Sequence, residues 1–115
     1  MSFPDSNDIL VGRSVGAAAW NYDILLPDGS FTRLVEGSKV TKVVQIAGPG
    51  TTKRVRIDAW LTRKYGTQKK GWTKMVGDGY VDFFGVSRRV QLHWYQSMCE
   101  GSPKRVEFKV KRYYN

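Results

Sequence analysis

The chain has 115 residues, 41% of them hydrophobic and 25% charged, an ordinary composition for one small globular domain with a single core. Nineteen Lys and Arg against ten Asp and Glu give a net charge of +9, which favours a polyanionic partner, with nucleic acid as the first candidate. The sequence excludes a membrane-spanning helix, an internal disulfide and a structural zinc site. It has no apolar stretch long enough for a span, and it contains one Cys and one His.

The first part of the chain predicts a β-hairpin followed by a strand. Residues 1–20 contain glycines that oppose a long helix, and we expect them to be weakly ordered or to form a linker. In NYDILLPDGSFTRLVE, residues 21–36, two short apolar runs flank Pro27-Asp28-Gly29. Because Pro presets the first turn position and Gly accepts positive φ, this pattern predicts a hairpin. The β-branched run over residues 40–47 predicts the next strand.

The middle of the chain predicts the main helix. GPGTTK, residues 48–53, interrupts any regular element, and Thr51 or Thr52 is placed to cap a helix over residues 53–65. Apolar residues recur there at spacings of three and four, and four basic residues occupy much of the remaining surface. Gly66 is the expected stop.

The last part predicts three antiparallel strands. A polar loop over residues 67–74 precedes strand-like runs at residues 79–84, 89–96 and 105–113, and the short connections favour a meander. We therefore predict a single α+β domain in which an antiparallel β-sheet packs on one main helix.

The only histidine lies in VQLHWYQ, residues 90–96. Alternation along a strand puts Val90, Leu92 and Trp94 on one face and Gln91, His93 and Tyr95 on the other. In the last strand Lys109 and Lys111 share the polar face with Glu107. If the two strands pair and their apolar faces cover the helix, His93 lies on the open face beside the lysines.

This juxtaposition suits RNA cleavage without a metal. Such cleavage needs a base for the 2′-hydroxyl, cations for the charge on the phosphorane and an acid for the leaving 5′-oxygen. His93 fits the base or the acid near neutral pH. Lys109 and Lys111 fit the electrostatic role, and Tyr95 or Thr51 offers a further hydrogen bond. A solvated surface histidine remains the alternative at this point.

Other chemistries have less support. The loop GPGTTK is too short for a Walker phosphate loop, the chain has no GxSxG stretch, and its ten acidic residues are scattered rather than clustered for metal ions. The aromatic strands of an RNA-recognition motif are also missing. We therefore expect neither a cofactor nor a metal.

Several stretches from Gly37 onward carry a resemblance to a known group. They are GSKVTKVVQIAGPGT, the helix ending in KYG, GWTKMVGDGYVD, RRVQLHWYQ and RVEFKVKRY. In these the chain resembles the toxin domains at the C-terminal ends of bacterial polymorphic toxins, of the Rhs-repeat and contact-dependent-inhibition types. Many such domains look like members of the ribonuclease group of barnase, the colicin-type tRNases and RelE. That group cleaves RNA without a metal on the open face of a sheet.

The resemblance implies a ribonuclease toxin that forms part of a larger protein delivered by a bacterial secretion system. It would act in the cytoplasm of the target cell on RNA such as tRNA, as a monomer without a membrane partner, and an acidic cognate immunity protein would neutralise it. In this hypothesis the catalytic residues are His93, Lys109 and Lys111, and the substrate-binding residues are Thr51, Trp72, Lys74 and Tyr95. Thr51 and Lys74 would hold a phosphate, and Trp72 or Tyr95 would stack a base.

Two alternatives to the enzyme stay open. A nucleic-acid-binding module without catalytic activity needs only the basic surface and the aromatic residues, and it predicts salt-sensitive binding without turnover. A protein-interaction domain would use the same basic face to meet an acidic partner.

Overall fold

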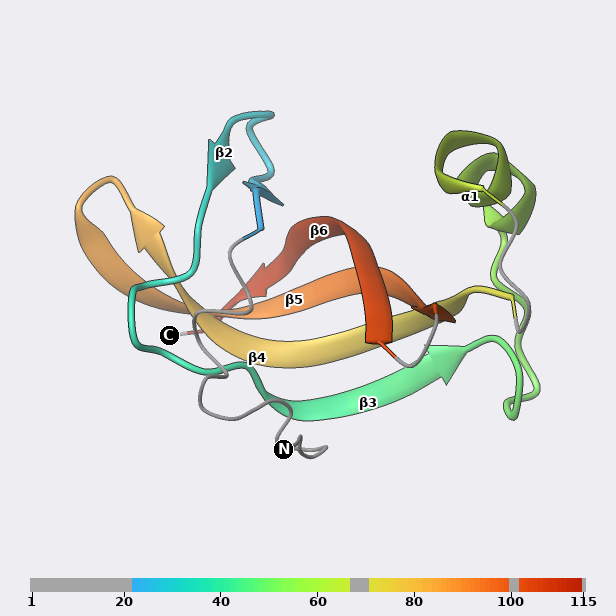
Figure 1. Ribbon diagram of the computed structural model, residues 1–115. Coiled ribbons are helices and arrows are strands. Elements are labelled where there is room, and N and C mark those ends of the chain that lie inside the picture. Colours follow the sequence, from blue (N-terminus) through green and yellow to red (C-terminus); the bar gives the residue numbers. More distant parts are fainter. Residues whose placement is uncertain (1–21, 67–70, 100–101, 115) are drawn as a thin grey trace.

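A mixed six-stranded sheet and one short helix make up the single domain that the computed structural model describes, over residues 22–66, 71–99 and 102–114 (Figure 1). The expectation for residues 1–20 lies outside these ranges. In chain order the elements are β1 (Ile24–Leu25), β2 (Phe31–Thr32), β3 (Thr41–Ala47), α1 (Asp58–Tyr65), β4 (Thr73–Phe83), β5 (Val86–Cys99) and β6 (Ser102–Tyr113). The strand order in the sheet is β2-β1-β6-β5-β4-β3.

The predicted hairpin and meander are confirmed. β1 and β2 pair antiparallel around the Pro27-Asp28-Gly29 turn, where the Asp28 carboxylate accepts a hydrogen bond of 2.9 Å from the Ser30 backbone. β4, β5 and β6 pair antiparallel in sequence order, and β3 adds to β4. These three strands are longer than predicted. β4, for example, already begins at Thr73, inside the expected polar loop.

The sheet is not purely antiparallel, which corrects the prediction. β1 runs parallel to β6, with Ile24 opposite Phe108 and Leu25 opposite Lys109. The described chain is also mostly sheet, since its helix has only eight residues, so the α+β class fits the structure only roughly.

The helix begins at Asp58 rather than at residue 53, so the predicted cap by Thr51 or Thr52 is wrong. The Lys53 carbonyl accepts a hydrogen bond of 2.8 Å from the Gly48 backbone, which closes a loop and diverts that carbonyl from the helical pattern. The Thr51 hydroxyl lies 2.8 Å from the Gly48 carbonyl, inside the same loop. The predicted stop at Gly66 is confirmed, and its N–H donates to the Thr62 carbonyl.

The main core lies inside the curved sheet. Its buried members are Ile24, Leu26, Val40, Met75, Val81, Val90, Leu92, Trp94, Phe108 and Val110. The connection between β2 and β3 covers this core: a Cβ added at Gly77 would lie 2.8 Å from Val40 Cγ1 and 3.0 Å from Trp94 Cη2. Gly77 therefore leaves the space that this connection needs above the sheet.

The same connection closes the sheet into a small barrel. The Val35 N–H donates to the Tyr80 carbonyl at 2.9 Å, and the Asp82 N–H donates to the Arg33 carbonyl at 3.0 Å. The chain after β2 thus pairs with β4, so that β2, β1, β6, β5 and β4 form a ring and β3 extends it beyond β4.

Helix α1 covers a second, smaller core at one end of the sheet (Figure 1). This core consists of Ala47, Val55, Leu61 and Trp72, with Ile57, Tyr65, Tyr95 and Val106 packed against it. The sequence analysis had predicted that the helix covers the apolar face of Val90, Leu92 and Trp94. That prediction is wrong, because this face is turned into the barrel.

Candidate functional site

One row of side chains crosses the outer face of the sheet. Consecutive register partners along it are Phe31, Leu25, Lys109, His93, Val76 and Val44. The row places His93 directly opposite Lys109 on the face that does not line the main core. Strand alternation had predicted that His93 lies beside Lys109, and the pairing of β5 with β6 confirms this placement.

His93 is nevertheless 8% exposed. Its Nε2 lies 3.2 Å from Gln91 Oε1, an arrangement in which Nε2 donates, while Nδ1 has no hydrogen-bond partner in the part of the chain that the structure describes. Burial, followed by the charges of Lys74, Lys111 and Lys109, lowers the pKa of His93 to about 4. The imidazole is therefore neutral near pH 7.

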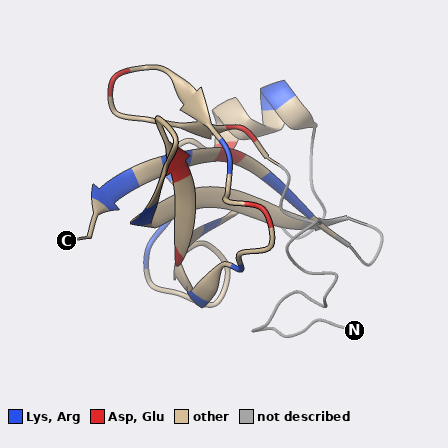
Figure 2. Cartoon of the chain, turned by 90° about the vertical axis from the view of Figure 1, so that its left-hand side faces the viewer, with Lys and Arg blue, Asp and Glu red and all other residues tan. Residues whose placement is uncertain are grey.

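A group of cations, here called the basic cluster, lies around Lys74, beside this row. Its members are Lys53, Arg56, Lys74, Lys109 and Lys111. They come from the loop before α1, from β4 and from β6, whose end is a basic stretch beside the C-terminus in Figure 2. Burial and then the charges of the other four members lower the pKa of Lys74, so the cluster holds mutually repelling charges close together.

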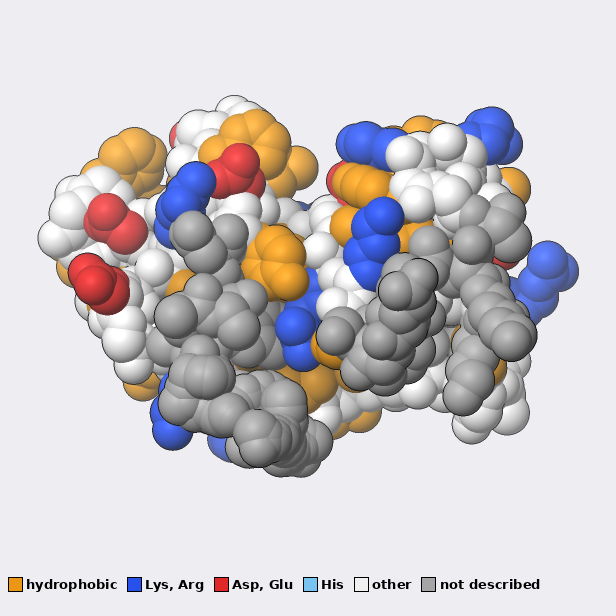
Figure 3. Space-filling view, viewed as in Figure 1, with side chains coloured by type: hydrophobic (Ala, Val, Ile, Leu, Met, Phe, Trp, Pro, Cys, Tyr) orange, Lys and Arg blue, Asp and Glu red, His pale blue; other side chains and the backbone are white. Residues whose placement is uncertain are grey.

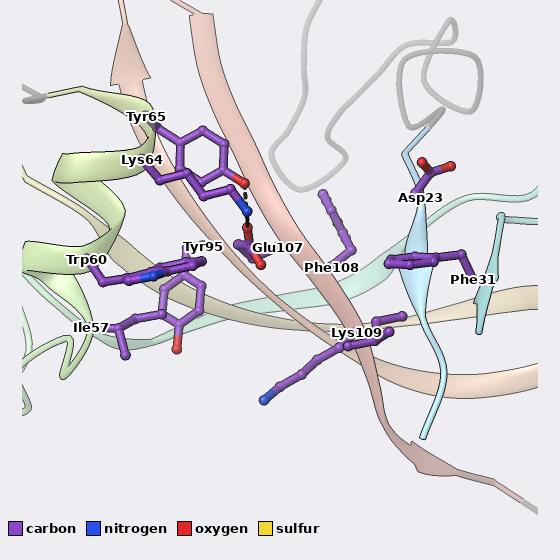
Figure 4. Close-up of a pocket in the computed structure, with 11 residues that line it drawn as sticks. Asp23, Phe31, Ile57, Trp60, Lys64, Tyr65, Tyr95, Glu107, Phe108 and Lys109 are labelled. Carbon is purple, nitrogen blue, oxygen red and sulfur yellow. Dashed lines mark hydrogen bonds and ion pairs between the residues drawn. The ribbon is translucent and has the colours of Figure 1, made fainter. Parts of the chain in front are cut away.

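A groove of about 750 Å³ adjoins the basic cluster, between the β1–β2 hairpin and α1 and across β6. In the view of Figure 3 it is the hollow between these two parts, and Figure 4 shows the residues that line it. The aromatic lining residues are Phe31, Trp60, Tyr65 and Tyr95, the charged ones are Asp23, Lys64, Glu107 and Lys109, and Leu25, Ile57 and Phe108 complete the wall. Lys109 belongs both to the groove and to the basic cluster.

Glu107 lies on the floor of the groove, where β6 is irregular. The register of β5 and β6 shifts between His93 and Tyr95, and Glu107 has a φ of 59°, a conformation that a residue with a side chain rarely adopts. Lys64 Nζ lies 2.9 Å from Glu107 Oε2, and the Tyr65 hydroxyl donates to the same oxygen.

These contacts set the protonation of the groove. Burial acts to raise the pKa of Glu107, but the hydrogen bonds from Tyr65 and Lys64 together with the Lys64 charge outweigh it and lower that pKa. Burial, with the hydrogen bond to Glu107, raises the pKa of Tyr65. The groove therefore holds a carboxylate, a neutral phenol and an ammonium group near pH 7.

The predicted site residues fall into two groups. His93, Lys109, Lys111, Lys74 and Tyr95 lie together, with Lys74 Nζ 5.9 Å from the centre of the Tyr95 ring. Thr51 and Trp72 instead line a second cavity of about 340 Å³ beside the loop before α1.

Trp72 does not fit the predicted stacking role. It is 1% exposed and belongs to the core under the helix, so its ring offers no face to a base. Of the two stacking candidates, Tyr95 alone reaches the groove.

Of the residues that line the groove, sequence reasoning had named only Tyr95 and Lys109 as site residues, and it missed the others. Trp60 and Lys64 are four residues apart on the helix, a spacing that already placed them on one face. The alternation of VEFKVK put Glu107 beside Lys109, but nothing in the strand pattern indicated that the hairpin and the helix would enclose both.

Comparisons with protein-family models, with curated proteins and with solved structures gave no match to this chain. Across residues 22–66, 71–99 and 102–114, no helix is both long and apolar enough to cross a membrane.

Proposed function

We propose that this domain binds nucleic acid, RNA in the first instance, with the basic cluster holding the phosphates. The observation that carries the proposal is the convergence of four cations on Lys74, so that five cations from three segments lie close together. Holding like charges together costs free energy in the unbound protein, and a phosphate backbone removes that cost on binding. The net charge of +9 supports attraction over a longer range.

The test is the salt dependence of binding to a fluorescent RNA oligonucleotide. With all five cations engaged, the slope of log K against log salt should be about −3.5 for a single strand, from about −0.7 for each phosphate contact. The double substitution Lys109→Ala and Lys111→Ala should make the slope shallower by about 1.4 and weaken binding at low salt. Lys39→Ala, at an exposed lysine outside the basic cluster, is the matched control. The proposal would fail if the RNA affinity did not change with salt concentration. It would also fail if the double variant had the same affinity and salt slope as Lys39→Ala.

RNA cleavage is the second candidate function, and the position of His93 opposite Lys109 and near Lys74 and Lys111 favours it. Nδ1 is the ring nitrogen left to accept a proton, and it is buried, so this role requires RNA binding to uncover it. His93 would then take the 2′-hydroxyl proton while the 2′-oxygen attacks phosphorus, and the lysines would neutralise the phosphorane. The leaving 5′-oxygen would receive a proton from Tyr95 or from water. A bound phosphate offsets the lysine charges that depress the pKa of His93, so binding itself makes the imidazole a better base.

Incubation with total bacterial RNA in EDTA separates binding from cleavage. Discrete products that are absent with His93→Ala would establish cleavage without a metal. RNA that stays intact while the gel shift persists would leave the binding function and remove the catalytic one.

The toxin role depends on cleavage. If RNA is cleaved, expression of the domain in bacteria should arrest growth, His93→Ala should relieve the arrest, and an acidic protein that covers the basic cluster should protect. Growth arrest that persists with His93→Ala would separate any toxicity from this chemistry.

A further inference from the structure

We propose that the groove between the β1–β2 hairpin and α1 takes unpaired bases of a single strand, with Glu107 accepting hydrogen bonds from their amino groups. This inference rests on the proposed nucleic-acid binding and names the form of nucleic acid. The basic cluster would hold the phosphates, and the groove would hold the bases.

The size and the lining of the groove suit a base. Its volume of about 750 Å³ lies within the range of small-molecule sites, which is roughly 300–1,000 Å³. Trp60 on α1 and Tyr95 on β5 lie at one end, and Phe31 on the hairpin lies at the other, as Figure 4 shows. Phe31 is 65% exposed and Trp60 is 39% exposed, so both rings are accessible. Stacking of a base on such a ring contributes about 1–3 kcal/mol.

The charges separate a place for bases from a place for phosphates. Inside the groove Glu107 is paired with Lys64, and Asp23 is paired with Arg33, so the lining offers a phosphate far less positive charge than the basic cluster does. A carboxylate instead accepts hydrogen bonds from the amino groups of cytosine, adenine or guanine. Lys64 and Tyr65 both engage Glu107 Oε2, whereas Oε1 accepts no hydrogen bond from the residues that the structure describes. One oxygen is thus fixed by the protein and the other is left for a ligand.

The groove and the basic cluster are continuous. Lys109 lines the groove and also acts on His93 and Lys74, and Lys74 lies over Tyr95. A flexible strand can therefore place a base in the groove and its phosphate on the basic cluster. A duplex keeps its bases stacked inside the helix and presents phosphates alone, so it gains nothing from the groove.

The experiment compares one labelled RNA sequence as a single strand and as a duplex, measured by fluorescence anisotropy. Trp60→Leu and Phe31→Ala should each weaken binding of the single strand about 5- to 150-fold without changing its salt slope, and should leave duplex binding unchanged. Phe84→Ala is the matched control, because Phe84 is 75% exposed in the β4–β5 turn, away from the groove. Phe31 is mostly exposed, so its variant keeps the test usable if the Trp60 variant loses stability.

A second arm tests Glu107 with oligocytidine and oligouridine, which differ mainly in offering an amino group or a carbonyl at the same position. The wild type should bind oligocytidine about 10-fold more tightly, and Glu107→Gln should reduce that preference, because a neutral amide is a weaker acceptor than a carboxylate.

The outcomes distinguish this inference from the proposal on which it rests. If the groove variants match Phe84→Ala while the Lys109→Ala and Lys111→Ala pair weakens binding, the groove inference fails and nucleic-acid binding stands. Equal affinity for the single strand and the duplex would overturn the inference that the groove takes unpaired bases. Equal affinity for oligocytidine and oligouridine would overturn the role given to Glu107. If the wild type binds none of these nucleic acids, both proposals fail.

Discussion

At the scale of single residues, His93 shows how burial and charge combine on the outer face of a sheet. It lies on the polar side of β5, yet it is nearly covered and has three lysines around it. Both effects disfavour the imidazolium, which is why its pKa falls rather than rises. Strand alternation could predict the face and the lysine neighbours. It could not predict the burial, which depends on the tertiary packing of neighbouring side chains.

This shift has a measurable consequence for stability. The pKa of His93 is about 4 in the folded protein, below the ordinary value of 6.5, so the unfolded chain binds more protons between these two values. Stability should therefore fall as pH drops from about 6.5 to about 4. We expect about 1–2 kcal/mol, less than the shift alone would give, because solvent and salt screen the lysine charges.

Urea unfolding across that pH range checks the prediction, with His93→Gln as the control. The variant cannot titrate there, so the difference in free energy of unfolding between the two proteins should vary with pH. Two parallel pH profiles would contradict the assignment. An NMR titration of the single imidazole gives the pKa directly.

Gly77 leads to a second prediction at this scale. Gly77→Ala would place a methyl group 2.8 Å from Val40 Cγ1 and 3.0 Å from Trp94 Cη2, and we expect a loss of about 1–3 kcal/mol in the free energy of unfolding. Val40→Ala in the same background should recover part of that loss by making room. Additive losses from the two substitutions would argue against the close approach of Val40 to β4.

At the scale of elements, α1 is tied to the sheet by the contacts of Lys64 and Tyr65 with Glu107 on β6. Tyr65→Phe removes one of these hydrogen bonds and keeps the ring in its place against Trp72. We expect it to cost about 1 kcal/mol and to speed hydrogen exchange in the helix. Thr62→Ala, within α1 but outside this contact, is the comparison. Unchanged exchange in the Tyr65 variant would mean that the second core alone holds the helix.

The elements also show where the sequence sufficed and where it did not. The hairpin turn, the β-branched run of β3 and the meander are encoded by neighbouring residues, and these predictions held. The start of α1 depends on the loop closed by Gly48 and Lys53, which competes with the helix for the same carbonyl. The parallel pairing of β1 with β6 joins distant parts of the chain, and periodicity within each strand carries no signal for it.

The groove had the same limitation. Its aromatic residues come from the hairpin, the helix and β5, and each alone resembles an ordinary exposed or half-buried side chain. Only the tertiary arrangement brings them together. Trp72 shows the converse, because the sequence presented it in a polar segment while the fold buried it under α1.

At the scale of the whole molecule, the basic cluster should make the free protein more stable as salt increases. The pKa of Lys74 is lowered by burial and by the four neighbouring cations, which means that its charged form is destabilising in the fold. Lys74→Met removes that charge and keeps the length of the side chain. The variant should be more stable than the wild type at low salt, and the difference should shrink as the Debye length falls from about 30 Å to about 8 Å.

Thermal unfolding in a series of NaCl concentrations measures this effect, with Lys39→Met as the control outside the basic cluster. If the stability of Lys74→Met and that of Lys39→Met change with salt in the same way, the salt effect arises from the net charge and not from the basic cluster.

The closure of the barrel has a kinetic consequence. The ring needs β1 to pair with β6, and therefore Ile24 cannot meet its partner Phe108 until β6 has been synthesised. Contacts so distant in sequence place the domain among slow two-state folders, which refold in milliseconds to seconds rather than microseconds. On a ribosome that adds about 5–20 residues per second, the hairpin waits for several seconds with its apolar side unpaired. Folding of this domain consequently follows the emergence of β6 from the ribosome, and β1 is a natural site for a chaperone to hold until then.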